Sequence, residues 1–182
     1  MDRQLIAHCS PTLAGIKTAN LFSYTFTSRE ALTDSIRSAN ETLNEKGVAV
    51  EALRIGESRA LILVYRESRL VQDWAREGVR EFMSGYGYDT KRVGGCISRL
   101  KSRFAAGADF PHEIGLFLGY PLPDVMGFIE NEGKNCKIVG CWKVYCDERR
   151  ALELFAKYKK CTGVYSKLYS RGRPIERLTV SA

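Results

Sequence analysis

The chain has 182 residues, which is long enough to bury a hydrophobic core without disulfides or a structural metal. It is 45% hydrophobic and 27% charged, with 16 glycines and 5 prolines, a composition that excludes collagen-like, disordered and low-complexity proteins. The formal net charge of +7 keeps anionic partners among the candidates. Because no internal repeat or linker is visible, we expect a single domain over residues 1–182.

The N-terminal residues and the cysteine content predict a cytoplasmic protein. Residue 2 is acidic and only three apolar residues directly precede His8, so no signal-peptide core is visible. The apolar run at residues 61–65 is far shorter than a bilayer span, and no membrane partner is expected. The six cysteines are therefore expected to be reduced thiols rather than a disulfide scaffold.

The first expected elements are a short helix and a strand. Ser10 is a favourable N-cap residue and Pro11 suits the first helical position, so a helix is predicted to begin there and to end near Gly15. Residues 20–26 are rich in aromatic and β-favouring side chains, which predicts the first strand.

A longer helix and a β-hairpin follow. Thr27 and Glu30 form a Thr-x-x-Glu capping box, and apolar residues then recur at helical spacing until Gly47. Residues 48–55 and 60–66 are two β-rich runs separated by four residues, a spacing typical of an antiparallel hairpin.

The middle of the chain is predicted to be helical. One helix is expected from Ser68 to about Met83, and another from a cap at Thr90 to Gly107. Residues 109–133 predict two short helices broken at residues 119–123, because a proline there cannot continue the preceding turn.

The last strong strand is predicted at residues 137–145, whose nearly continuous apolar character is typical of the interior of a sheet. Asp147 is then expected to cap a helix that runs through Cys161. This order of elements predicts the α+β class, with a mixed β-sheet of about four strands, including one antiparallel hairpin, layered with five to seven helices.

The first candidate site lies in residues 8–17, HCSPTLAGIK. Cys9 is expected just before a helix N-terminus, where the helix dipole and free N–H groups favour a reactive thiolate. In this interpretation Cys9 is the nucleophile or redox thiol, His8 is its base, and Lys17 and Thr12 bind an anionic small molecule. The alternative is that Cys9 is a small buried side chain.

The second candidate site is the helix start at His112 and Glu113. An acidic residue in a first helical turn is also what the helix dipole alone favours. The zinc-protease motif His-Glu-x-x-His is incomplete because residue 116 is Leu. If His112 and His8 converge, they would give either a general base for Cys9 or a metal-binding pair, with Glu113 as a further catalytic candidate beside them. The leading hypothesis is thus a small-molecule or thiol-chemistry site built from two helix N-termini, with the reaction, any cofactor and the oligomeric state left open.

The remaining cysteines do not predict a metal site. Cys136, Cys141 and Cys146 are spaced by five residues, unlike the Cys-x2-Cys spacing of zinc and iron–sulfur sites. In a continuous strand Cys141 would also point away from the other two. We therefore expect packing thiols and no bound metal.

Most of the positive charge lies near the C-terminus. Residues 157–177 contain seven basic residues and one acidic residue, which leaves +6 of the total +7. Three tyrosines interleave with these basic residues, a pattern that can combine phosphate contacts with base stacking. The alternative hypothesis is a non-enzymatic protein that binds nucleic acid or an acidic partner here, although no common nucleic-acid-binding motif is present. The candidate residues are Lys157, Lys159, Lys160, Lys167, Arg171 and Arg173, with Tyr158, Tyr165 and Tyr169 between them.

Three motifs together resemble one protein family. They are residues 8–17, residues 110–121 (FPHEIGLFLGYP) and residues 141–145 (CWKVY). The family consists of uncharacterised proteins, a domain of unknown function, found mainly in anaerobic Gram-positive bacteria. The resemblance covers nearly the whole chain and implies a bacterial, intracellular, single-domain protein, but it brings no established activity.

Overall fold

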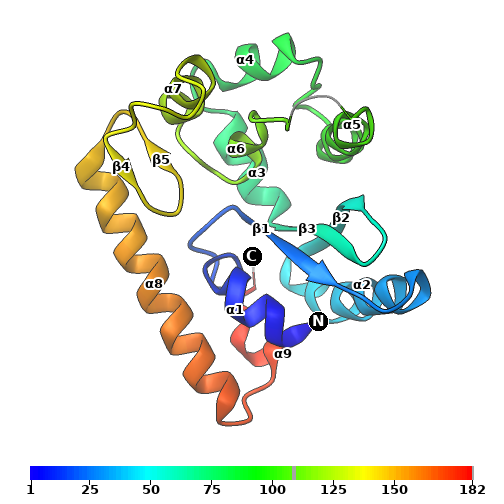
Figure 1. Cartoon of the computed structure of the whole chain (residues 1–182). Helices are drawn as coiled ribbons and strands as arrows, with labels where there is room; N and C mark the ends of the chain where they lie inside the picture. Colours follow the sequence, from blue (N-terminus) through cyan, green and yellow to red (C-terminus); the bar gives the residue numbers. More distant parts are fainter. Residues whose placement is uncertain (108–109, 182) are drawn as a thin grey trace.

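The computed structural model describes residues 1–107 and 110–181 and confirms the α+β class. A three-stranded antiparallel sheet lies at the centre, helices cover both of its faces, and a small two-stranded hairpin lies to one side (Figure 1). The main sheet is therefore purely antiparallel and smaller than the mixed sheet of about four strands predicted from the sequence.

The central sheet consists of the three strands expected from the first half of the chain. They are β1 (Ala19–Thr25), β2 (Ala49–Ile55) and β3 (Arg59–Tyr65), in the order β1-β3-β2. Both neighbours run antiparallel to β3, with Phe22 and Val50 opposite Ile62 and Val64. The predicted hairpin of the second and third strands is confirmed.

Each face of the sheet carries its own hydrophobic core, because side chains along β3 alternate between the faces. Ile62 and Val64 pack with α1 (Asp2–Leu13), α2 (Arg29–Leu43) and the C-terminal α9 (Ile175–Leu178). Leu61 and Leu63 face the other core. That core is covered by α3 (Glu67–Trp74), α4 (Val79–Gly85), α5 (Val93–Ala105) and α6 (Ile114–Phe117).

The boundaries of α2 follow the predicted pattern with one correction. Ser28 is the N-cap rather than Thr27, and its hydroxyl accepts a hydrogen bond from the Ala31 N–H. The helix continues into the 3-10 turn η1 (Asn44–Lys46) and ends at Gly47, which has a φ of 73°. Glycine suits this left-handed position because it has no Cβ.

The helix predicted from Ser68 to Met83 is two helices. Gly78, with a φ of 75°, separates α3 from α4. The next helix, α5, begins after Arg92 rather than at Thr90. The two short helices predicted in residues 109–133 are present as α6 and α7 (Leu122–Glu130), while the expected start at Asp109 lies outside the described residues.

The predicted strand at residues 137–145 is wrong. These residues fold back on themselves as β4 (Ile138–Val139) and β5 (Lys143–Val144), so they form a separate hairpin rather than the interior of the main sheet. Gly140 at the turn lies so close to Phe155 that an added Cβ would be 2.1 Å from that ring. Contacts from outside the segment therefore determine its shape.

The longest helix is α8 (Glu148–Ser170), which follows the hairpin and runs along one side of the molecule beside α1 (Figure 1). Asp147 caps it as predicted, by accepting a hydrogen bond from the Arg150 N–H. It extends well beyond Cys161 because Gly163 is accommodated within it. In the described part of the chain, no helix combines the length and apolar character needed to cross a membrane.

Candidate functional site

The first candidate motif lies within a helix rather than before one. Helix α1 begins at Asp2 and continues through Pro11, so the predicted helix start at Ser10 is wrong. A proline inside a helix costs about 3 kcal/mol. Here the helix also buries Leu5, Cys9 and Leu13 completely against the sheet. This packing offsets the local cost.

Cys9 therefore lacks the environment expected of a nucleophile. Its side chain is fully buried, and burial raises the pKa of its thiol, with Lys17 opposing that shift. No helix N-terminus is near it in the sequence, and it lines none of the cavities described below. The structure places Cys9 as a packing side chain.

Lys17 is the most unusual charged group of this segment. It is 6% exposed, and its Nζ donates a hydrogen bond of 2.6 Å to the Ala19 carbonyl oxygen. Burial lowers the pKa of Lys17 to about 8, while the Cys141 and Cys9 thiols oppose the shift. Among residues 1–107 and 110–181, no carboxylate forms an ion pair with it. A buried ammonium group without an acidic partner is costly, and it is suited to an anionic ligand.

Lys17 faces a cavity of about 470 Å³ between α1, α8 and the β4–β5 hairpin, which we call the basic cavity. Exposed Lys159 of α8 and exposed His8 of α1 also line it, and none of its lining residues is acidic. His8 stacks on Phe22 with the ring centroids 5.4 Å apart. The other lining residues are Pro11, Asn20, Leu21, Leu118, Tyr120, Cys141, Phe155, Tyr158 and Thr162.

Thr12 contributes to the basic cavity indirectly. It is completely buried, and its hydroxyl donates a hydrogen bond of 2.7 Å to Asn20 Oδ1. Because the amide oxygen of Asn20 is used in this way, the amide N–H groups remain available to a ligand. Thr12 is therefore a positioning residue for Asn20 rather than a ligand-binding group.

Arg66 fixes the segment that carries Lys17, a role that the sequence did not indicate. Its guanidinium group is buried and donates to the carbonyl oxygens of Thr12, Leu13 and Val180 at 2.6–2.8 Å and to that of Lys46 at 3.0 Å. A cation at the last carbonyls of α1 also complements the helix dipole. Arg66 thus ties α1 to the C-terminal residues and to the end of α2.

His112 and Glu113 do not join the basic cavity. His112 is exposed, whereas Glu113 is 1% exposed and already paired. The carboxylate of Glu113 lies 2.5 Å from Arg103 Nε and accepts a hydrogen bond of 2.8 Å from the Tyr88 hydroxyl. The helix that follows, α6, begins at Ile114 and has only four residues. Glu113 is therefore the buried partner of Arg103 in a structural ion pair.

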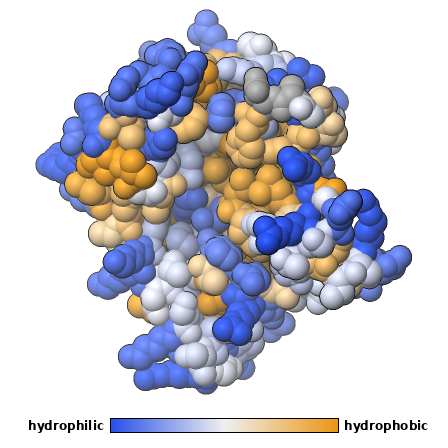
Figure 2. Space-filling view, in the orientation of Figure 1, coloured by the Kyte–Doolittle hydropathy of each residue, from blue (hydrophilic) through white to orange (hydrophobic). Residues whose placement is uncertain are grey.

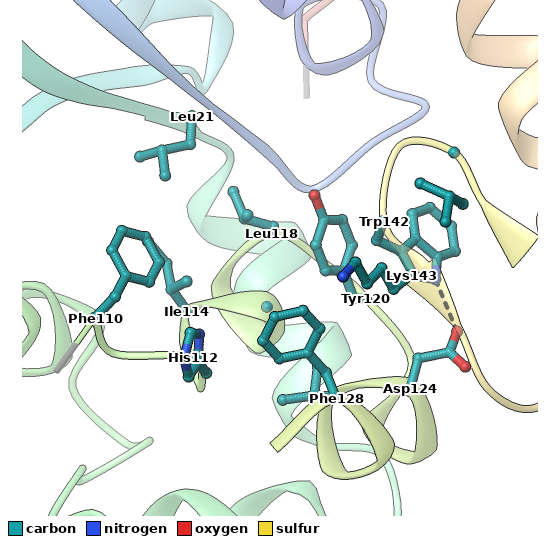
Figure 3. Close-up of a pocket in the computed structure, with 14 residues that line it drawn as sticks. Leu21, Phe110, His112, Ile114, Leu118, Tyr120, Asp124, Phe128, Trp142 and Lys143 are labelled. Atoms are coloured by element: carbon teal, nitrogen blue, oxygen red, sulfur yellow. Dashed lines mark hydrogen bonds between the residues drawn. The ribbon is translucent and has the colours of Figure 1, made fainter. Parts of the chain in front are cut away.

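His112 instead lines a second cavity of about 400 Å³, which we call the apolar cavity. Figure 2 shows apolar surface on both sides of a hollow between the β4–β5 hairpin and the middle of the molecule. Phe110, Ile114, Phe128 and Trp142 surround the cavity in Figure 3. The other lining residues are Leu21, Gly115, Leu118, Tyr120, Asp124, Val125, Val139, Gly140 and Lys143.

Asp124 anchors the hairpin that separates this cavity from α8. Its carboxylate accepts hydrogen bonds from Trp142 Nε1 at 2.7 Å, drawn as a dashed line in Figure 3, and from the backbone N–H groups of Tyr145 and Cys146 at 2.7 and 3.0 Å. It lies in the first turn of α7, where an acidic side chain complements the helix dipole. The long-range partners give it a second role that no local pattern indicates.

The two cavities are neighbours rather than one site. Leu21, Leu118 and Tyr120 line both of them. His8 and Lys17 lie on one side of these shared residues and His112 lies on the other, while Cys9 and Glu113 are buried away from both cavities. The composite site expected from the two sequence motifs is therefore not assembled in a single cavity.

The basic C-terminal residues divide between two roles. Lys159 lines the basic cavity, whereas the other candidates are exposed along α8 and the turn that follows it, namely Lys157, Lys160, Lys167, Arg171 and Arg173. The tyrosines between them do not share this exposure. Tyr165 and Tyr169 pack against the core beneath α1, and Tyr158 packs beside the hairpin. An exposed platform for base stacking is thus not formed by these tyrosines.

Cys141 is the thiol that the fold brings to the basic cavity. Cys141 is exposed at the hairpin turn. Partial burial nevertheless raises the pKa of its thiol, while Lys17 lowers it. Cys136 and Cys146 are half-buried on either side of the hairpin. In the described ranges, no three metal-ligating side chains gather into a group that could hold a metal ion.

Together the fold and the site define an α+β protein with a basic cavity and an apolar cavity on either side of Tyr120. Residues 5–179 match the family described as Protein of unknown function (DUF3793), so the chain belongs to this family. No curated protein and no solved structure matches the chain.

Proposed function

We propose that this protein binds an anionic small molecule in the basic cavity. The observation that carries the proposal is the nearly complete burial of Lys17 beside this cavity without an ion-pair partner among the described residues. Lys159 adds a second positive charge at the rim, and the hydroxyl groups of Tyr158 and Thr162 add hydrogen-bond donors. A phosphate or carboxylate group pairs with ammonium groups and accepts hydrogen bonds from hydroxyl groups, so the lining of this cavity suits it.

The proposal differs from the thiol chemistry expected at Cys9. Cys9 is fully buried, so the anion-binding part of the expected site is retained and the Cys9 nucleophile is not. Any thiol chemistry in the basic cavity falls to Cys141, which lines it.

Isothermal titration calorimetry with inorganic phosphate and with acetate, at low ionic strength, tests the proposal. We expect Lys17→Met and Lys159→Met each to weaken anion binding about tenfold, because each removes one charge from the cavity. Lys160→Met is the matched control, since Lys160 is the exposed neighbour of Lys159 on α8 and does not line the cavity. Equal affinity of Lys159→Met, Lys160→Met and the unchanged protein would overturn the proposal.

The proposal also predicts how anion affinity depends on pH. Because burial lowers the pKa of Lys17 to about 8, the ammonium group loses its proton above that pH in the free protein. Anion affinity is expected to fall as the pH rises from 7 to 10, and to fall much less in Lys17→Met. A pH profile that Lys17→Met leaves unchanged would contradict the assignment of Lys17 as the binding group.

A further inference from the structure

The apolar cavity lies next to the basic cavity and offers a ligand apolar contacts rather than charged partners. Its walls are mostly aromatic and aliphatic side chains, as Figure 3 shows. Its polar groups are largely engaged elsewhere. Asp124 accepts three hydrogen bonds. Lys143 Nζ donates a hydrogen bond of 2.6 Å to the Gly133 carbonyl oxygen, and it lies 5.6 Å from the centroid of the Phe128 ring. This cavity therefore suits the apolar part of a ligand.

The boundary between the two cavities is formed by side chains that belong to both. Tyr120 lies between Leu118 and Trp142 in Figure 3, and its ring is stacked on Trp142 with the centroids 4.8 Å apart. Lys17 also lies over the same ring, with its Nζ 5.4 Å from the ring centroid. An anionic group at Lys17 is thus one aromatic ring away from the apolar walls.

From this arrangement we propose that the ligand is an amphipathic anion. Its carboxylate or phosphate group binds at Lys17 and Lys159, and its alkyl or aryl part passes Tyr120 and Leu118 into the apolar cavity. This inference rests on the proposed anion binding and narrows it to one ligand class. A cavity of about 400 Å³ is within the range that holds a small organic ligand.

Chain length provides a direct test. Each methylene group removed from water contributes about fourfold in affinity. Titration with butyrate, hexanoate, octanoate and decanoate should therefore show tighter binding at every step, until the cavity is filled. A parallel series of alkyl phosphates identifies which anionic group is preferred, and a chain-length gain in either series supports the inference.

A double variant shows whether the gain arises in the apolar cavity. Phe110 and Val139 line it and are 47% and 71% exposed, so Phe110→Ser with Val139→Ser removes apolar contact at little cost to the fold. The control is Val71→Ser with Leu152→Ser, two apolar residues that are 47% and 50% exposed and line neither cavity. We expect the gain per methylene to fall below about twofold in the first variant and to be unchanged in the control.

The outcomes separate this inference from the proposed function. If butyrate binds in a Lys17-dependent manner and longer chains bind no more tightly, the amphipathic ligand is excluded while anion binding stands. If the chain-length gain persists in the Phe110 and Val139 variant, the apolar cavity is not the site and the inference fails. If no member of either series binds, both proposals fail.

Discussion

The ammonium nitrogen of Lys17 lies over the ring of Tyr120, 5.4 Å from its centroid, and Tyr120 lines both cavities. This distance is within the range of a cation–π interaction. The Tyr120 hydroxyl donates a hydrogen bond of 3.2 Å to the Cys141 carbonyl oxygen, and the Tyr120 ring stacks on Trp142. Tyr120 therefore links the segment between α1 and β1 to the hairpin, and both cavities depend on its position.

The burial of Lys17 predicts an unusual pH dependence of stability. The pKa of Lys17 is lowered from 10.5 to about 8 in the folded protein. Between these two pH values the unfolded chain binds more protons than the folded chain, so the free energy of unfolding rises with pH in this window. A shift of this size corresponds to about 3 kcal/mol, a cost that is present in full below pH 8 and disappears above pH 10.5.

Urea denaturation of the unchanged protein and of Lys17→Met at pH 7, 8, 9 and 10 measures this effect. Other titrating groups act in both proteins and largely cancel in the difference. The unchanged protein should gain stability relative to Lys17→Met by about 2–3 kcal/mol from pH 7 to pH 10. Parallel stability curves would show that Lys17 is not held in a desolvated position.

The burial of Cys9 predicts that it resists thiol reagents in the native protein. Cys9 is fully buried, whereas Cys141 lies at the exposed hairpin turn. With excess iodoacetamide at pH 8, we expect Cys141 to react slowly because its pKa is raised, but well before Cys9, which should react only after unfolding. Peptide mass spectrometry at successive times measures both rates. Modification of Cys9 as fast as Cys141 would restore Cys9 as a candidate nucleophile.

How well the sequence predicted this molecule depended on the range of the interactions involved. The strands of the central sheet and helix α2 follow from local periodicity and turn residues, and they were predicted nearly to the residue. Helix α1 was not predicted correctly, because its packing against residues distant in the sequence offsets the cost of Pro11 within the helix. The hairpin at residues 138–144 was not, because Asp124 imposes its shape from α7.

The candidate site shows the same limit. Lys17 was identified from its position beside a polar motif, and the structure places it at a cavity. Lys159, Tyr120 and Cys141 reach that cavity from segments more than one hundred residues further along the chain. No spacing rule connects such residues, so only the tertiary fold reveals that they share a surface.

Arg66 is expected to be essential for stability because of its bonding to the backbone. Arg66→Met leaves four carbonyl oxygens without this donor, those of Thr12, Leu13, Lys46 and Val180. We expect the free energy of unfolding to fall by about 3–5 kcal/mol. Arg66→Lys keeps the charge, but its single nitrogen cannot reach all four oxygens. We therefore expect this variant to lower the free energy of unfolding by about 2 kcal/mol. Chemical denaturation measures both values. The exposed Arg80→Met is the control and should change stability by less than about 0.5 kcal/mol.

Asp124 is expected to control the hairpin and, through it, both cavities. In Asp124→Asn an NH2 group replaces one acceptor oxygen, and it then faces either the Trp142 indole N–H or the N–H groups of Tyr145 and Cys146. We expect a loss of about 2–3 kcal/mol in stability, since one or two donors lose their acceptor.

The matched control is Asp147→Asn, which makes the same change of charge at the N-cap of α8, where Asn caps as well as Asp. Amide hydrogen exchange should show faster exchange at Tyr145 and Cys146 in Asp124→Asn and no change there in Asp147→Asn. Anion binding should weaken only in Asp124→Asn, because Cys141 and Tyr120 lose their fixed positions beside Lys17. If the hairpin amides remain protected in Asp124→Asn, its carboxylate does not hold the hairpin, and the walls of the cavities must be fixed by the packing of Trp142 against Tyr120 and Phe155 alone.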